Sequence, residues 1–584
     1  MSRLGIKQPS QKDVTGTIVM MYDDEDGSQN QADSIFLKRS ENGLILHPQP
    51  QDNPNDPLNW PKWKRDLCLL IIGTQTFLGG GQTPILAAGF SGLSTEFNTP
   101  LTTLSYLVGG FMLALGFGSV LASPTALLYG KRLVYLAGIL LFLVGAIWAG
   151  AAKSFGSLMG ARVIMGLGAS PTESLPSATI AEIYFAHERA YRVGIYTMLL
   201  LGGKNIVPLL SGLVFQYLDR HWLFWILSMF LGCTLISTFF FVPETFWERS
   251  PIPNKRSLEE TDAARQVEKE HPHEHRPNEW ARSREPSTMN VLQHNVDTNS
   301  LSSSETHEPS DTNVVGFTEG EQTEIPTIHD TTKKSFRSEL ALFSGRHTID
   351  SWWMIALRPF FLYLYPSVIF GSIVYSLSVV WLIVISETIS EIFRGDGYGY
   401  SQSTVGLFYV SPFVGGVCGS MFTGLVSDRI SRYMISKNHG VYEPEFRLVM
   451  LVVSTFFISF GLMGFGWSSQ QTDLWIGPIV FFGCVGFGSS MASTTAITFT
   501  VDSYKMFAAE ALVSFNFSKN LLGFIFSLFN NAFMSSRGPR TTFVVYGCVQ
   551  IFVSLFAVPM YIYGKKFRSW TDEKEILKRL YKDT

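Results

Sequence analysis

Charged side chains are scarce in this chain of 584 residues: Asp, Glu, Lys and Arg together make up 16% of it, whereas about 25% is usual in a soluble protein. The formal net charge is only −3, so the composition gives no sign of a nucleic-acid partner. All five cysteines fall inside apolar segments, which excludes the disulfide framework of a small secreted protein. These absences exclude most classes of soluble protein.

Several catalytic patterns are also missing. The sequence contains no GxxxxGK[ST] phosphate-binding loop, which argues against ATP-driven transport. It shows no paired carboxylates, metal-ligand spacing or nucleophile elbow, so we predict that the protein is not an enzyme and binds no cofactor and no metal. The His-rich stretch 271–275 (HPHEH) is interpreted as part of a solvated linker rather than as a metal site.

Apolar residues, in contrast, are abundant. They form 46% of the chain, with 46 Phe and 51 Gly. A helix needs about 20 apolar residues to cross a bilayer, and continuous runs of that length are helical in lipid. Two sets of six such runs predict an all-α membrane protein with twelve transmembrane helices: 67–89, 104–127, 133–152, 157–180, 193–217 and 222–242, then 360–386, 404–426, 447–467, 474–500, 509–533 and 541–563.

The polar segments divide the chain into five parts. Residues 1–65 form a polar tail, 66–245 the first six-helix bundle, 246–357 a linker, 358–563 the second bundle and 564–584 a C-terminal tail. The linker is rich in Ser, Glu, Pro and His and poor in apolar residues, which predicts disorder.

Basic residues predict the orientation in the membrane. If both termini lie in the cytosol, most loop Lys and Arg residues share that side, and few lie on the other. We therefore expect cytosolic termini and a cytosolic linker. The residues on the cytosolic side are Lys131, Arg132, Arg189, Arg192, Arg429, Arg432, Lys437, Lys565 and Lys566.

Two six-helix bundles joined by a long linker resemble the major facilitator superfamily, in which two halves rock about a site near the midplane. Residues 162–168 (RVIMGLG) are similar to a motif of this superfamily, and so are the loop 424–432 (GLVSDRISR) and, in weaker form, 123–132 (SPTALLYGKR). Residues 203–212 (GKNIVPLLSG) resemble a motif of its twelve-span drug:proton antiporters, with Val207 and Ser211 in place of glycines. Leu127 stands where the family carries an Asp, so the acidic part of the latch in the first half is missing.

A further ordered set of short motifs resembles a fungal branch of these antiporters, the branch that contains the yeast high-affinity polyamine permease. The resemblance covers about residues 55–570 without the linker. The segments that carry it are 55–60 (NDPLNW), 173–175 (ESL), 182–185 (EIYF), 187–189 (HER), 243–245 (PET), 445–448 (EFRL), 501–504 (VDSY) and 563–566 (YGKK).

Charges inside the membrane are candidate functional groups, because each costs at least about 2.5–3.5 kcal/mol to insert. Glu173, near the middle of the fourth span, is predicted to carry the coupling proton or to hold a cationic substrate, or else to be a structural ion-pair partner. Lys204 and Asn205 lie at the centre of the fifth span. Lys204 is interpreted as a partner for an anionic group, as the counter-ion of Glu173, or as a packing residue. Lys519 and Arg162 are further candidates for binding, proton relay or gating.

Aromatic and helix-end residues complete the predicted site. Tyr375 and Trp381 in the seventh span are predicted to line the cavity and to hold a cation against their ring faces. A second set at the cytosolic helix ends is predicted to latch the two halves in the outward-facing state. This set consists of Asp428, Arg429, Arg432 and Asp502.

The membrane charges argue mildly against a polycation as substrate, because one carboxylate, Glu173, stands against Arg162, Lys204 and Lys519. Glu387 adds a carboxylate only at the outer end of the seventh span. We therefore hypothesise a proton-coupled secondary transporter of a small organic molecule, narrowly favoured as an exporter of a toxic compound or secondary metabolite. The first alternative is an importer of polyamines or other organic cations.

A hypothesis of another class is a nutrient sensor that keeps the transporter fold and signals through its linker and tails. Linker deletion separates the two, since a transporter keeps its flux and a sensor loses its output. We expect a monomer in the lipid bilayer of the plasma membrane, with the vacuolar membrane as the alternative location.

Overall fold

The computed structural model describes residues 4–7, 14–19, 38, 46, 48, 50–51, 53–247, 333–343, 345–347, 351–395, 397–438 and 441–574. Most of the predicted linker and much of the polar N-terminal tail therefore lie outside the described residues.

Helices make up both predicted bundles. The first bundle contains α1 (Lys62–Gly80), α2 (Phe90–Phe97), α3 (Leu101–Leu104), α4 (Tyr106–Tyr129), α5 (Lys131–Ala151), α6 (Phe155–Ala169), α7 (Pro171–Ser174), α8 (Pro176–Ile183), α9 (Ala186–Tyr217) and α10 (Arg220–Phe241). The second contains α13 (Trp352–Phe361), α14 (Pro366–Arg394), α15 (Gln402–Leu407), α16 (Val410–Lys437), α17 (Met450–Gln471), α18 (Ile476–Ser503), α19 (Ala508–Leu555) and α20 (Ala557–Lys574). Short elements between them are η1 (Pro57–Asn59), η2 (Ala87–Gly89), α12 (Phe336–Glu339), η3 (Leu362–Leu364), η4 (Pro444–Val449) and η5 (Lys505–Phe507).

Within the described residues, nine helices are long and apolar enough to cross a membrane. Three further crossings bring the total to the predicted twelve: α1, the chain of short helices α6–α7–α8, and a second crossing within the 48-residue α19, whose helical backbone is interrupted at Gly538 (φ 78°). The all-α fold predicted from the apolar runs is thus confirmed.

Proline and glycine account for two of the places where the helices differ from the predicted spans. Pro171 and Pro176 divide the fourth span into three helices, because proline lacks the amide hydrogen that a helix interior needs. Helix α1 ends at Gly80, earlier than the predicted residue 89 and within the run Gly79–Gly81. Glycine gains the most conformational freedom on leaving a helix.

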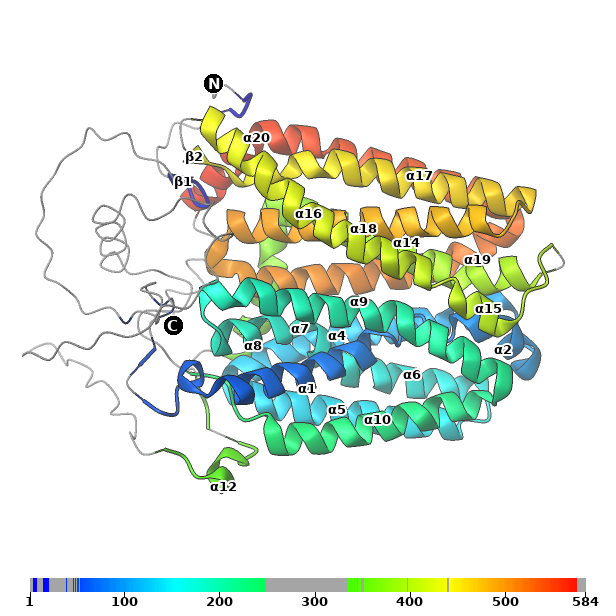
Figure 1. The fold of residues 1–584 in the computed structure, drawn as a ribbon, viewed down its shortest axis with the longest axis horizontal. Coiled ribbons are helices and arrows are strands. Elements are labelled where there is room, and N and C mark those ends of the chain that lie inside the picture. Colours follow the sequence, from blue (N-terminus) through cyan, green and yellow to red (C-terminus); the bar gives the residue numbers. More distant parts are fainter. Residues whose placement is uncertain are drawn as a thin grey trace, which may run out of the picture.

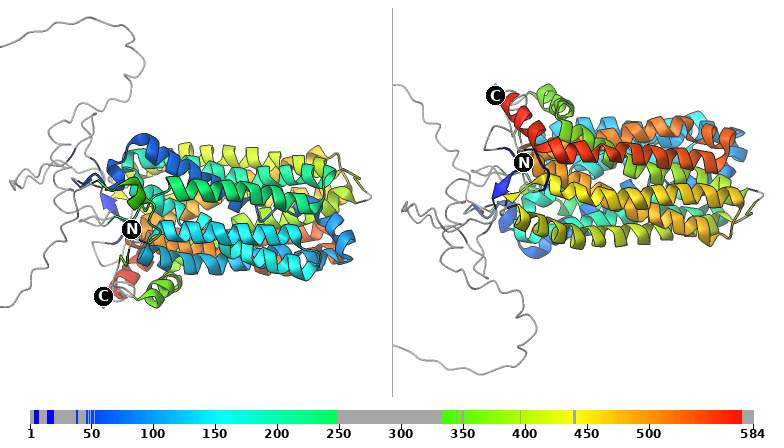
Figure 2. Two further views of the ribbon diagram at one scale, coloured as in Figure 1. Left: turned by 90° about the horizontal axis from the view of Figure 1, so that it is seen from below. Right: turned by 90° about the horizontal axis from the view of Figure 1, so that it is seen from above.

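The two bundles lie side by side, and their long helices are aligned along the long axis of the molecule (Figure 1). The end that carries β1 (Ile18–Val19), β2 (Val441–Tyr442), α12 and the C-terminal part of α20 is called the terminal end. The opposite end, which carries α2 and α15, is called the distal end. Views from two further sides show the same two-ended arrangement (Figure 2).

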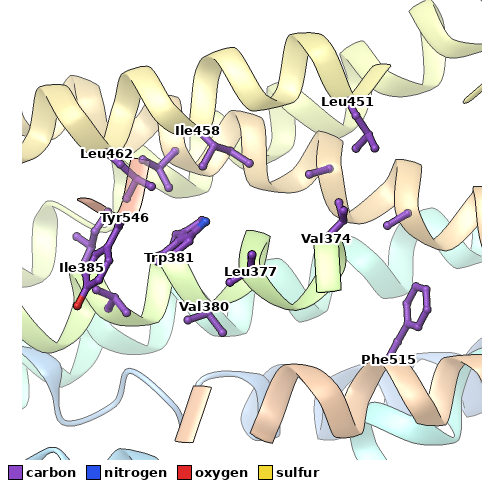
Figure 3. Packing of buried hydrophobic residues seen from close by; sticks show 14 of the residues in the cluster. Val374, Leu377, Val380, Trp381, Ile385, Leu451, Ile458, Leu462, Phe515 and Tyr546 are labelled. Atoms are coloured by element: carbon purple, nitrogen blue, oxygen red, sulfur yellow. The ribbon is translucent and has the colours of Figure 1, made fainter. Parts of the chain in front are cut away.

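Each bundle has its own apolar core. In the second bundle, Trp381 is fully buried and stacks on Tyr546, with ring centroids 5.3 Å apart. Ile458 and Leu462 from α17 pack close by (Figure 3). The indole nitrogen of Trp381 donates to Gln550 Oε1 at 2.7 Å, so this large side chain is both buried and satisfied.

The N-terminal tail crosses over to the second bundle. Strand β1 pairs antiparallel with β2, with Ile18 opposite Tyr442 and Val19 opposite Val441. Ile6 is fully buried, in a cluster with side chains of α16 and η4. A segment that precedes the first bundle is therefore packed against the terminal end of the second.

Candidate functional site

A buried ion pair joins the two bundles, and this pair with the side chains around it is called the centre below. Glu173 lies on the short helix α7, and its Oε2 is 2.6 Å from Lys519 Nζ of α19. Their side chains are only 8% and 3% exposed. The amide of Asn516 also donates to the Glu173 carbonyl oxygen at 3.2 Å. The break of the fourth span by two prolines thus places a carboxylate where it meets the other bundle.

Lys204 lies close enough to act electrostatically on both Glu173 and Lys519. The direct ion-pair partner of Glu173 is nevertheless Lys519. One carboxylate and two ammonium groups give this centre a net positive charge. Asn205 is buried and donates to Leu201 O of its own helix at 2.9 Å.

Two groups that the sequence reasoning did not single out complete the centre. Asn520, one residue after Lys519, is fully buried and lies beside the Glu173 carboxylate. Among the described residues, neither its amide oxygen nor its amide nitrogen makes a hydrogen bond of good geometry. Tyr196 of α9 is half-buried and lies within electrostatic reach of both Glu173 and Tyr375. A buried amide without partners is costly, and it supplies a donor and an acceptor to a bound molecule. A single-sequence pattern cannot distinguish this Asn from its neighbours Asn516 and Asn530.

The two aromatic candidates occupy different places. Tyr375 is half-buried, stacks on Phe515 with centroids 5.4 Å apart and lies near Glu173. Trp381 lies inside the core of the second bundle, and its contacts do not bring it to Glu173. The predicted roles of both residues in binding stay predictions.

Arg162 is fully buried within the first bundle. Its Nη2 donates to Gln82 O at 2.7 Å and its Nε donates to Leu107 O at 3.4 Å, while the guanidinium lies over the ring of Phe111 at 4.4 Å from the centroid. These contacts join α4 and α6 to the turn after α1. The structure does not bring Arg162 to the Glu173 centre, and its proposed part in gating stays a prediction.

The four predicted latch residues all lie at the terminal end of the second bundle. Arg447 of η4 gathers the two acidic ones: its Nε lies 2.7 Å from Asp502 Oδ2, and its Nη1 lies 3.9 Å from Asp428 Oδ1. Arg429 and Arg432 are exposed. The described contacts of Asp428 and Asp502 are thus made within one bundle, and a latch between the bundles stays a prediction.

The hydroxyl of Tyr442 reinforces this group by donating to Asp502 Oδ2 at 2.6 Å. Burial, and then the neighbouring Asp502 carboxylate, raise the pKa of the Tyr442 phenol well above its usual value. The phenol therefore remains a hydrogen-bond donor over the physiological pH range.

The distal end is closed by neutral contacts between the bundles, which we call the distal seal. The hydroxyls of Ser91 and Ser390 lie 3.0 Å apart, and Asn531 donates to Ser105 Oγ at 2.5 Å. Ala87 of the first bundle packs among the core residues of the second, and Ile383 of the second packs into the core of the first.

Two glycines bring the backbones of α9 and α15 together at the same end. A Cβ atom on Gly212 would lie 2.7 Å from Gln402 O and 3.0 Å from the Gly406 Cα. At the terminal end, the hydrogen bonds between bundles that the described residues make come from α13, the segment before it and the tails. The distal end of the helical interface is therefore closed by direct contacts between helices of the two bundles.

Comparison with known proteins gives one consistent result. The sequence model of the Major Facilitator Superfamily matches residues 70–527. Protein HOL1 of Saccharomyces cerevisiae is 24% identical, over 93% of this chain and 94% of its own length. The MFS antiporter QDR3 of Candida albicans is 22% identical, over 92% of this chain and 82% of its own.

Among solved structures, the xylose transporter XylE from E. coli, in a partially occluded inward-open conformation, superposes with a TM-score of 0.52. It shares 12% sequence identity over 85% of this chain and 97% of its own. At this identity the likeness shows the fold alone.

Proposed function

The chain belongs to the major facilitator superfamily, and we propose that it is a proton-coupled secondary transporter that moves a small organic molecule across a fungal membrane by alternating access. Its membership makes it a membrane transporter and not an enzyme, as the sequence predicted. The observation that carries the proposal of proton coupling is the buried Glu173–Lys519 pair, because this ionisable contact joins the two bundles.

The charges of the centre support a substrate that is not a polycation. The Glu173 carboxylate is already paired with Lys519, and Lys204 adds a second positive charge nearby. A polyamine would bring more positive charge to a site that already carries an excess of it. A zwitterionic or anionic amphipathic molecule fits better, with Lys204 holding its anionic group and Asn520, Tyr196 and Tyr375 holding its polar and aromatic parts.

The direction we favour is export in exchange for protons. The name of QDR3, an MFS antiporter, supports antiport. Import of an organic cation remains the alternative, and it requires Glu173 to leave Lys519 for the substrate. We further propose that the protein acts as a monomer in the plasma membrane, or alternatively in the vacuolar membrane, with its terminal end in the cytosol.

Flux measurements with two probes, a zwitterion and a polycation, test this proposal. Full-length protein in proteoliposomes with a pH gradient would be supplied with the zwitterion norfloxacin or with labelled spermidine. We expect proton-dependent transport of norfloxacin, lost in Glu173→Gln and weakened in Lys204→Gln. The matched control is Glu573→Gln, at an exposed carboxylate of α20. Proton-dependent spermidine flux without norfloxacin flux would instead establish the importer of organic cations.

A further inference from the structure

A second carboxyl group is buried in the membrane part of the protein, and it differs from Glu173 in its surroundings. Glu387 of α14 is 2% exposed. The Ser527 hydroxyl donates to its Oε1, and the Asn530 amide nitrogen donates to its Oε2 at 3.2 Å. Both donors come from α19 of the same bundle and both are neutral.

No cation among the described residues lies within 4.0 Å of Glu387, where an ion pair would form. Helices α15 and α17 and the short helix η2 carry no ionisable residue that faces it, and the only charged residue of α18 is Asp502 at the terminal end. On α2, Glu96 is paired with Arg220. The phenols of Tyr409 and Tyr546 lie within electrostatic reach of Glu387. On α14 itself, the next ionisable residues are Glu391 and Arg394, toward the distal end.

A carboxylate without a cation is unfavourable in such a place, whereas a neutral carboxylic acid is well accommodated. The Ser527 hydroxyl can reverse its role and accept from the carboxyl proton, while the Asn530 amide keeps donating to the other oxygen. The same two partners therefore suit a protonated Glu387, and ionisation requires access to water.

The two helices around Glu387, α14 and α19, connect it to the distal seal. Ser390, one helical turn further along α14, contacts Ser91 and Ala88 O of the first bundle. Asn531, the residue after Asn530, donates to Ser105. Opening of the distal seal therefore moves both helices that enclose the carboxyl group away from the first bundle.

We propose that Glu387 is a second proton-binding site of the transporter, protonated while the distal seal is closed and ionised when the seal opens and water reaches it. The proposal rests on the proposed function. When the seal opens, the carboxyl group releases its proton to water at the distal end, and before the seal closes the carboxylate takes a proton back from that water, so the site equilibrates with the pH of the distal side and carries no net proton across the membrane. Glu173, with its ammonium partner, is left to respond to the substrate.

The first test needs no substrate. Full-length protein in lipid nanodiscs would be titrated from about pH 5 to about pH 9, the range that brackets shifted carboxyl groups, and followed by infrared spectroscopy. We expect the carbonyl band of a protonated carboxyl group that fades as the pH rises. Glu387→Gln should abolish this band and Glu173→Gln should retain it. A band unchanged by Glu387→Gln, or one that does not titrate, overturns the proposal.

A chemical measurement on the unmodified protein guards against a variant that fails to fold. Dicyclohexylcarbodiimide reacts with protonated carboxyl groups in apolar surroundings, and peptide mass spectrometry locates the product. We expect modification of Glu387 that falls as the pH rises and none at Glu173, which is held by Lys519. Absence of modification at Glu387 over the whole range contradicts the proposal.

The link to the seal has its own reporter. Ala87 is 3% exposed and lies in the seal. The variant Ala87→Cys would be made in a protein from which the exposed native cysteines have been removed. It would then be treated with a membrane-impermeant maleimide added at the distal end. We expect labelling to rise with pH and this rise to be lost with Glu387→Gln. Labelling independent of pH overturns the coupling. Norfloxacin flux is a separate readout: its absence beside a titrating Glu387 contradicts the proposed substrate, not the proton site.

Discussion

The two ends of the molecule are held together by different chemistry. The distal seal joins the two bundles through hydroxyls, amides and close backbone contacts, without an ion pair between the bundles among the described residues. At the terminal end, buried charges form networks within each bundle, such as Arg568 with Glu443 at 2.9 Å and Glu445 at 2.8 Å. In the first bundle, Lys131 pairs with Glu182 at 2.6 Å.

The difference indicates which parts move. A neutral hydrogen bond contributes only about 0.5–1.5 kcal/mol because water replaces it easily. Removal of one partner from a buried ion pair costs about 3–5 kcal/mol. The distal seal is therefore suited to open and close, and the charge networks are suited to keep each bundle rigid while it does. The Glu173–Lys519 pair is the exception, since it is a charged contact that crosses between bundles.

The largest effect is expected at the terminal end. Arg568→Ala leaves Glu443 and Glu445 buried beside Lys565 alone, which should destabilise the protein by about 3–5 kcal/mol. Thermal unfolding of the purified protein in detergent measures this loss. The control is Arg432→Ala, at an exposed side chain of α16. Equal unfolding temperatures for the two variants would contradict a stabilising role for the network.

The central pair should give the next largest effect. Glu173→Gln or Lys519→Gln leaves the other charge buried, at a cost of roughly 3 kcal/mol, and we expect both single variants to unfold at lower temperature. The double variant should be more stable than either, because it removes both charges. A double-mutant cycle of unfolding temperatures checks this, and strictly additive losses would show that the two groups do not interact.

Overpacking of the seal is expected to shift it toward the open state. A Cβ atom on Gly212 would meet backbone atoms of α15, so Gly212→Ala should cost the closed state about 1–3 kcal/mol. Maleimide labelling of the Ala87→Cys reporter should then increase. Gly232→Ala is the control, because nothing lies within 4 Å of a Cβ atom there. Unchanged labelling in Gly212→Ala would mean that α9 and α15 do not hold the seal.

The smallest effect is expected from a single hydroxyl. Ser390→Ala removes the contact with Ser91 and should weaken the closed seal by about 1 kcal/mol, which raises labelling of the same reporter slightly. Ser436→Ala, at an exposed position of the terminal end, should have no effect on it. If Ser390→Ala lowered the unfolding temperature as much as Arg568→Ala does, the distinction between an easily opened seal and rigid bundles would be lost.

Much of the architecture was predictable from the sequence. Runs of about 20 apolar residues must be helical in lipid, so the twelve crossings and their division into two bundles follow from composition along the chain. The ordered motifs also predicted the superfamily. Glu173 stood out because a charge is expensive inside a bilayer. The structure places it in an ion pair between the bundles, and its role in proton coupling stays a prediction.

The partners of that charge were not predictable. The sequence offered Lys204 as a counter-ion, yet the close contact is with Lys519, 346 positions along the chain. Nor did the sequence indicate that Trp381 belongs to a bundle core, because an apolar helix gives little sign of which face meets lipid, a neighbour or a cavity. The N-terminal tail gave no sign of its docking on the second bundle.

The sequence by itself determined which segments enter the membrane and how costly each buried charge is, because both depend on local composition. Only the tertiary structure decided how each charge is compensated. It gives Glu173 an ammonium partner from the other bundle and gives Glu387 two neutral donors from its own. The physical reason is that compensation depends on atoms a few ångströms apart in space, which here are 140 to 346 residues apart in the chain.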